Sequence, residues 1–292
     1  MPRAAPPRPL PAWGAPAALT LLLALAAPGL APTAAAQVVR SGTASDAAGL
    51  TATVNQFRAD LGGALNPNNP GSVGSGRREI NWDGVPDALS APNAFPGDFF
   101  NAPIAGRARG AVFTTPGTGF QVSANAGVGP VEFGNLNAAY PDQFVAFSPQ
   151  RLFTALASNT MDVSFFVPGT TTPAAVRGFG AVFTDVDLAN TTSLSYFGLN
   201  DELLGTFFAP TANNGLSFLG VSYSSDIITR VRIISGNTAP GVAEALPAVD
   251  IVVLDDFIYA EPVAVVPEPG TWLMMATGLT GLAGLAIRRR RS

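Results

Sequence analysis

The 292-residue sequence contains no cysteine, no histidine and no lysine, so every basic residue is an arginine. Without cysteine the chain can form neither a disulfide nor a thiolate nucleophile. Without histidine it lacks the usual general base and the commonest transition-metal ligand. Serine–histidine–aspartate triads, cysteine–histidine pairs and histidine-containing zinc sites are therefore excluded within this chain.

The N-terminal segment has the three parts of a secretory signal peptide. Arg3 and Arg8 give a positive start, residues 17–27 are apolar and leucine-rich, and Ala34 to Ala36 supply the small residues of a cleavage site. We expect a signal peptide over residues 1–36, removed by cleavage after Ala36. A membrane-spanning helix is the weaker alternative, because the apolar run is short and ends at a Pro-Gly pair.

The C-terminal segment also has three parts, and their order is specific. A proline-flanked motif is followed by an apolar stretch over residues 272–287 and by four arginines: Val266, Pro267, Glu268 and Pro269, then Arg288, Arg289, Arg290 and Arg291. The two prolines lack an amide donor and cannot continue a helix or strand. The apolar stretch would form a helix of about 24 Å at about 1.5 Å per residue. The arginines favour the cytoplasmic side of a membrane.

This tail resembles the PEP-CTERM sorting signal of Gram-negative bacteria, and the resemblance covers residues 266–292 only. It implies an exosortase partner in the inner membrane, processing near the Pro-Glu-Pro triplet, and release or transfer to the cell surface. The transmembrane helix over residues 272–287 would then be a temporary targeting signal. A plain C-terminal anchor with a stop-transfer arginine cluster is the alternative.

The region between the two targeting segments, residues 37–265, is strongly acidic. It holds ten of the sixteen basic residues and nineteen of the twenty acidic ones, which gives a net charge of −9. Such a charge disfavours nucleic acid and anionic lipid as partners and favours divalent cations.

The exported region is predicted to be all-β, a jelly-roll-like β-sandwich with one short N-terminal helix. Leu50, Val54, Phe57 and Leu61 repeat with the period of a helix, and Ser45 or Asp46 can cap its start. From residue 111 onward the period is two, and short apolar runs alternate with turn residues. Eleven strands are expected, over residues 111–115, 119–124, 131–133, 143–147, 161–167, 175–185, 193–198, 203–208, 217–222, 229–235 and 250–260.

Four aspartates stand at unusual positions in these strands. Asp185 and Asp187 close one apolar strand, and Asp255 and Asp256 lie inside the last one. Because a buried carboxylate is costly unless it is paired or bound to a metal, two hypotheses follow. One is a calcium site formed by the four aspartates. The other is pairing with arginine or N–H groups, for which Arg177, Arg230 and Arg232 are the available arginines.

The segment Asn81, Trp82 and Asp83 is a candidate sugar-binding motif, because an exposed tryptophan beside polar groups can stack on a sugar ring. The alternative is a core tryptophan, which agrees better with the usual burial of this residue. A glycoside hydrolase needs two carboxylates, and Glu79 with Asp83 would be the first pair to examine. No motif defines a reaction, so no catalytic residue is assigned.

Together these patterns predict an exported protein of the cell envelope or exopolysaccharide matrix. A structural, adhesive or carbohydrate-binding role is the leading expectation, with exopolysaccharide as a partner. The alternative is a carbohydrate-active enzyme of the glycoside hydrolase type on the same scaffold.

Overall fold

The computed structural model describes residues 36–265 and 277–278. Within residues 36–265 strands dominate, α1 (Ala47–Asp60) is the one α-helix, and η1 (Asp87–Leu89), η2 (Phe99–Asn101) and η3 (Tyr140–Asp142) are short 3-10 helices. The strands are β1 (Gln37–Ala44), β2 (Arg77–Ile80), β3 (Ala111–Thr114), β4 (Gly119–Val122), β5 (Phe153–Leu156), β6 (Thr160–Phe165), β7 (Ala174–Ala175), β8 (Gly178–Val186), β9 (Ser193–Phe197), β10 (Leu203–Phe208), β11 (Ala212–Tyr223), β12 (Arg230–Ile234), β13 (Val253–Ala260) and β14 (Val263–Ala264). The mostly-β prediction with one short helix is confirmed.

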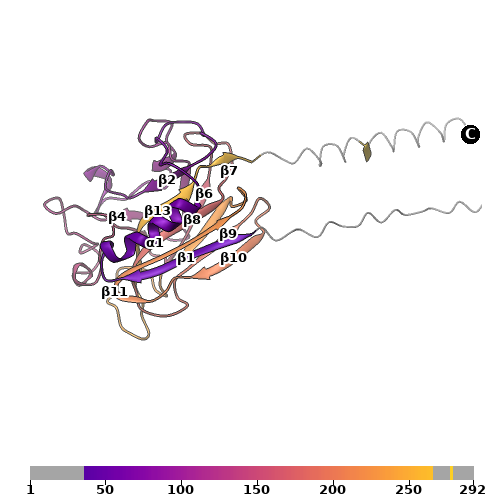
Figure 1. The fold of residues 1–292 in the computed structure, drawn as a ribbon. Coiled ribbons are helices and arrows are strands. Elements are labelled where there is room, and N and C mark those ends of the chain that lie inside the picture. Colours follow the sequence, from indigo (N-terminus) through magenta and orange to yellow (C-terminus); the bar gives the residue numbers. More distant parts are fainter. Residues whose placement is uncertain (1–35, 266–276, 279–292) are drawn as a thin grey trace, which may run out of the picture. The chain divides into compact units, whose positions relative to one another are not determined.

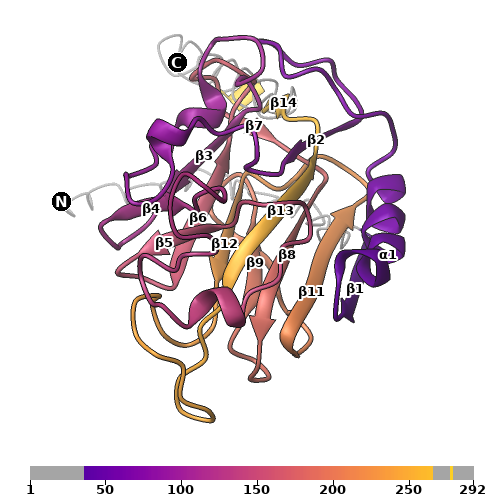
Figure 2. The same cartoon turned by 90° about the vertical axis from the view of Figure 1, so that its left-hand side faces the viewer.

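The long strands form two open sheets. The larger one has seven strands in the order β1-β11-β8-β13-β5-β4, with β2 paired to β13. The smaller one has five strands in the order β10-β9-β12-β6-β3, while β14 pairs with β7 alone. Every strand ladder is antiparallel. Figure 2 shows the larger sheet running from β1, beside α1, across to β5 and β4 on the opposite side.

Both sheets contribute to one continuous hydrophobic core. Phe183 of β8 and Phe257 of β13 come from the larger sheet, and Tyr196 of β9 and Val231 of β12 come from the smaller one. Since a sheet buries an apolar face by packing it against another element, the shared core means that the two sheets pack face to face. Residues 36–265 therefore carry a complete core of their own.

The helix α1 covers the outer face of the larger sheet (Figure 1). Asp46 caps its start by accepting a hydrogen bond of 2.9 Å from the Gly49 N–H, as the sequence predicted. The ring of Phe57 lies on the sheet where Gly180 and Gly220 stand side by side. A Cβ at either glycine would come within 2.8 Å of this ring, so the close packing of the helix requires glycine at both positions.

Two of the predicted strands are wrong. Residues 131–133 form a turn, in which Glu132 and Phe133 have positive φ angles of 47° and 62°. Residues 143–147 form a loop after η3. The aromatic residues that suggested strands here, Phe133, Tyr140 and Phe144, are buried in a second, smaller core cluster. The apolar residues that fitted the pattern of short strands thus pack inside a folded loop.

The predicted targeting segments lie outside the described residues. This applies to the signal peptide over residues 1–36, of which only Ala36 is described, and to the sorting motif, membrane helix and arginine cluster of residues 266–292. Thr277 and Gly278 are the described exceptions and are helical. The described residues contain no helix that is long and apolar enough to cross a membrane.

Candidate functional site

A β-bulge interrupts β13, at the centre of the larger sheet. The register with β8 shifts between Leu254 and Phe257, so that Asp255 and Asp256 together face the single residue Val182. A bulge leaves an extra residue outside the ladder and re-aims the neighbouring side chains, and bulges are frequent beside functional sites. In a regular strand the two aspartates would point to opposite faces. Here both are buried, with 0% and 3% of their surface exposed.

The neighbouring loop holds both carboxylates of this bulge. The N–H groups of Phe147 and Ser148 donate to Asp255 Oδ2 at 2.5 Å and 3.2 Å. The Ser148 hydroxyl lies 3.1 Å from Asp255 Oδ1 and 2.8 Å from Asp256 Oδ1. Burial, and then the charge of Asp256, raise the pKa of Asp255 well above its usual value. Burial also raises the pKa of Asp256 to about 6, so the pair binds protons more tightly than exposed aspartates do.

The arginines expected to pair with these aspartates lie elsewhere. They pair with other carboxylates: Arg230 and Arg232 with Asp162, and Arg177 with Asp226. The arginine beside the bulge is Arg58 of α1, whose Nη2 lies 3.7 Å from Asp256 Oδ2. Naming Arg177, Arg230 and Arg232 as the partners was therefore wrong, while the expected N–H hydrogen bonds are present.

Trp82 is a core residue. It is 0% exposed, and its ring stacks on Phe153 with centroids 3.9 Å apart and an interplanar angle of 8°. Its Nε1 donates a 2.7 Å hydrogen bond to the carbonyl of Asp255, at the bulge. No face of this ring is free for a sugar, so the sugar-stacking hypothesis is corrected in favour of the core alternative.

The two polar neighbours of Trp82 have different roles. Asp83 Oδ1 accepts hydrogen bonds from the N–H groups of Gln150 and Arg151 at 2.7 Å and 3.2 Å, so it fixes the loop that precedes β5. Asn81 is exposed and lines a pocket. Of the three residues in the predicted sugar-binding motif, Asn81 is the one that faces this pocket.

The pocket beside the bulge has a volume of about 340 Å³. Its polar lining comes from α1, β2, β13 and several loops: Arg58, Asn68, Glu79, Asn81, Arg109, Ser148 and Asp256. Arg58 links its two carboxylates, because Nη2 lies 2.8 Å from Glu79 Oε2 and 3.7 Å from Asp256 Oδ2. Asn68 Oδ1 and Arg109 Nε are buried and have no hydrogen-bond partner among the described residues.

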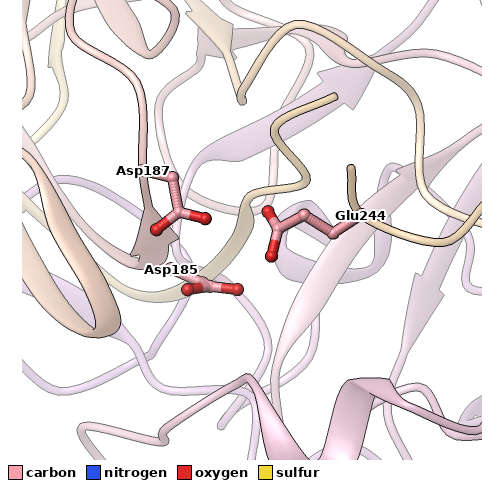
Figure 3. Close-up of side chains that lie close together, drawn as sticks. All are labelled: Asp185, Asp187 and Glu244. Carbon is pink, nitrogen blue, oxygen red and sulfur yellow. The ribbon is translucent and has the colours of Figure 1, made fainter. Parts of the chain in front are cut away.

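A second acidic cluster lies at the far end of β8 (Figure 3). Asp185, Asp187 and Glu244 each offer a carboxylate oxygen, and these oxygens lie within 4.8 Å of one another. Asp185 has a positive φ of 68° and is 1% exposed. Its Oδ1 accepts a 2.7 Å hydrogen bond from the Asn214 N–H, while its Oδ2 has no hydrogen-bond partner among the described residues.

The electrostatics of this cluster are unfavourable for three ionised carboxylates. Burial, and then the charges of Asp187 and Asp250, raise the pKa of Asp185 to about 7. Burial, and then the neighbouring carboxyl groups of Asp187 and Asp185, raise the pKa of Glu244 to about 8. Burial and the charge of Asp250 raise the pKa of Asp187 as well. Without a counter-charge, the cluster therefore favours protonated carboxyl groups.

The predicted group of four aspartates is thus divided between two places. Asp185 and Asp187 are brought together, while Asp255 and Asp256 form the bulge and are not in the cluster. Glu244, which sequence reasoning left out of the metal group, completes it instead. No local signal marked Glu244, because it stands in a proline-containing loop far along the chain from Asp187, and only the fold brings them together.

The comparisons with known proteins identify the tail. Residues 265–291 match the family model of the PEP-CTERM protein-sorting motif, which confirms the resemblance drawn from the order of its parts. Such a motif implies sorting to the cell surface by an exosortase. No curated protein and no solved structure matches the chain, so the function of the exported domain must be argued from its own residues.

Proposed function

We propose that the chain is an exported protein of the cell envelope or exopolysaccharide matrix with a structural or adhesive role, and that its domain of residues 37–265 binds a carbohydrate. Residues 1–36 would be the signal peptide and residues 266–292 the sorting signal that an exosortase removes at the inner membrane. The observation that carries the carbohydrate proposal is the polar pocket beside the β13 bulge.

The strand order supports a jelly-roll-like β-sandwich. From β5 onward the eight longer strands pair in the orders β5-β13-β8-β11 and β6-β12-β9-β10. Two four-stranded antiparallel sheets wound in this way correspond to the two Greek keys of a jelly roll. Lectin domains use this architecture, but a fold does not define a ligand, so the argument depends on the pocket.

The pocket has the size and chemistry that a sugar requires. Its volume of about 340 Å³ lies at the lower end of the range of about 300–1,000 Å³ for small-molecule sites. A sugar hydroxyl both donates and accepts hydrogen bonds, and the pocket offers both functions. The side-chain amides of Asn68 and Asn81 can both donate and accept, while Leu65 and Phe147 add apolar surface.

The test is calorimetric titration of residues 37–265 with extracellular polysaccharide purified from the native host. We expect binding by the native sequence and a loss of at least tenfold in affinity in Asn68→Ala and Asn81→Ala, whose side chains line the pocket. Asn93→Ala is the matched control, because Asn93 is exposed and does not line this pocket. Binding that all three variants retain would refute the pocket as the sugar site.

An enzymatic function is the second candidate, and one observation favours it. Glu79 and Asp256 line the same pocket and share Arg58, and burial raises the pKa of Asp256 to about 6. A carboxyl group with a raised pKa near a second carboxyl group is the arrangement of a glycosidase acid and its partner. Incubation with the same polysaccharide would then release reducing ends, and Glu79→Gln would abolish this release. Binding without product supports the non-enzymatic role.

A further inference from the structure

We infer that Asp185, Asp187 and Glu244 form a binding site for a calcium ion. The site is separate from the carbohydrate pocket, and the inference does not depend on the sugar proposal. Figure 3 shows the three carboxylates pointing toward a common centre from β8, from the residue after it and from the loop that carries Glu244. One oxygen from each lies within 4.8 Å of the others.

The protein supplies no cation of its own to this cluster. Among the ion pairs of the described residues, none involves Asp185, Asp187 or Glu244. The sequence has no lysine or histidine that could serve. Asp250 adds a fourth negative charge nearby. Because buried charges of one sign are costly without compensation, the positive charge must come from solution.

Both carboxylate oxygens of Asp250 accept hydrogen bonds from neighbouring groups, so Asp250 is not counted among the ligands of the ion. Its Oδ1 accepts from the Asp187 N–H at 3.2 Å, and its Oδ2 accepts from the Leu188 N–H at 3.3 Å and the Thr191 hydroxyl at 2.5 Å. These bonds fix the turn after β8, and with it the position of Asp187. Asp250 thus orients a ligand and strengthens the negative potential.

The remaining ligands are held in position before any ion binds. The Asn214 N–H holds Oδ1 of Asp185 at 2.7 Å, while the buried Oδ2 has no hydrogen-bond partner among the described residues, and Figure 3 shows this carboxylate beside those of Asp187 and Glu244. Glu244 is oriented by the Gln143 side-chain amide, which donates to Oε2 at 3.0 Å. An oxygen buried at a site without a donor is what a metal ligand requires, and it is otherwise rare in proteins.

The donor set favours calcium over other divalent ions. The three donors of the cluster are carboxylate oxygens, which hard cations prefer and which suit transition metals less well than nitrogen or sulfur. Each of the three carboxylates offers one oxygen to the site, and water would complete the six to eight ligands of calcium. Magnesium demands near-ideal octahedral geometry and keeps several waters, so it should bind this site less tightly.

The experiment is a calcium titration of residues 37–265 after treatment with EDTA, followed by calorimetry and by the midpoint of thermal unfolding. We expect one calcium per chain, a rise of several degrees in the midpoint, and a smaller response to magnesium at the same concentration. Asp187→Asn and Glu244→Gln should each reduce the affinity at least tenfold. Circular dichroism at low temperature verifies that the variants are folded.

Two control variants distinguish this site from the other carboxylates. Asp98→Asn removes an exposed charge, and Asp256→Asn removes a carboxylate of the bulge; both should bind calcium as the native sequence does. If calcium addition gives no heat of binding and does not shift the midpoint of thermal unfolding, protons neutralise the cluster and the inference fails. It fails equally if Asp187→Asn and Glu244→Gln bind calcium normally, or if magnesium gives the same response as calcium.

Discussion

The buried ion pair between Arg78 and Glu261 offers a direct test of how the loops are held to the sheet. The two side chains are 0% and 1% exposed, and they meet through two hydrogen bonds, from Nε to Oε2 at 2.6 Å and from Nη2 to Oε1 at 2.8 Å. Arg78 also donates to the Ala108 carbonyl at 2.6 Å. Glu261 accepts from the Asn66 side chain at 2.8 Å and from the Val73 N–H at 3.0 Å. Three segments distant in sequence, residues 66–78, residue 108 and residue 261, thus meet at one pair.

Replacing Glu261 with Gln keeps the shape of the side chain and removes its charge. The guanidinium of Arg78 then remains buried without a counter-charge, and one of its two carboxylate acceptors is lost. Removing one partner of a buried pair costs about 3–5 kcal/mol. Since domains are stable by only about 5–15 kcal/mol, Glu261→Gln should remove a large part of the free energy of unfolding.

The measurement is urea unfolding of residues 37–265, followed by the fluorescence of Trp82, the only tryptophan in that range. The matched control is Asp60→Asn. Asp60 meets Arg40 through a similar pair of hydrogen bonds, at 2.6 Å and 3.0 Å, but these side chains are 20% and 37% exposed. Solvent screens an exposed pair, so this variant should unfold close to the native midpoint. Equal midpoints for the two variants, with equal slopes, would refute the reasoning.

Three further predictions address the tail, the core and the bulge. In the native host, mass spectrometry of the mature protein should recover no peptide from residues 272–292; a dominant intact C-terminus would favour a plain anchor. Trp82→Ala should lower the free energy of unfolding by about 3–5 kcal/mol, measured by circular dichroism, because the ring is fully buried against Phe153; a loss below about 1 kcal/mol, the typical effect of any point mutation, would contradict its core role. Burial raises the pKa of Asp256 from 3.8 to about 6, so the folded state binds this proton more tightly than the unfolded state. Its stabilising contribution is complete below about pH 4 and is lost as the pH rises through 6. Asp256→Asn should therefore flatten the stability profile between pH 4 and 7, and an unchanged profile would exclude this group as the cause.

Much of the fold could be predicted because it depends on local patterns. The spacing of Leu50, Val54 and Phe57 gave α1, and the apolar runs around residues 178–186 and 253–260 gave the central strands β8 and β13. β1 was missed because most of its residues are exposed and its place depends on pairing with β11. A strand whose position is set by a distant partner carries little signal of its own.

The candidate sites were less predictable, since each depends on a contact between distant segments. No sequence pattern around Glu244 predicts that it lies close to Asp187. Likewise, no pattern around Ser148 predicts its hydrogen bonds with Asp255. The arginine beside the bulge could not be predicted for the same reason. Arg58 occupies an ordinary position in the predicted helix. Only the packing of α1 beside β2 brings its Nη2 to 2.8 Å from Glu79 Oε2. Residue type indicated which groups needed partners, but the chain topology determined which partners they received.

The position of the bulge explains why the core and the pocket are connected. A doublet of aspartates interrupts a strand whose other residues are all apolar and buried, and such local violations concentrate at functional or strained sites. The extra residue turns the Asp255 carbonyl toward the Trp82 N–H, at 2.7 Å, while the carboxylate of Asp256 lines the pocket. The same backbone irregularity thus anchors the central aromatic residue and places an acidic group at the pocket wall. Shortening β13 by one residue to restore a regular ladder would disturb both at once, which is the physical reason to regard the bulge as part of the site.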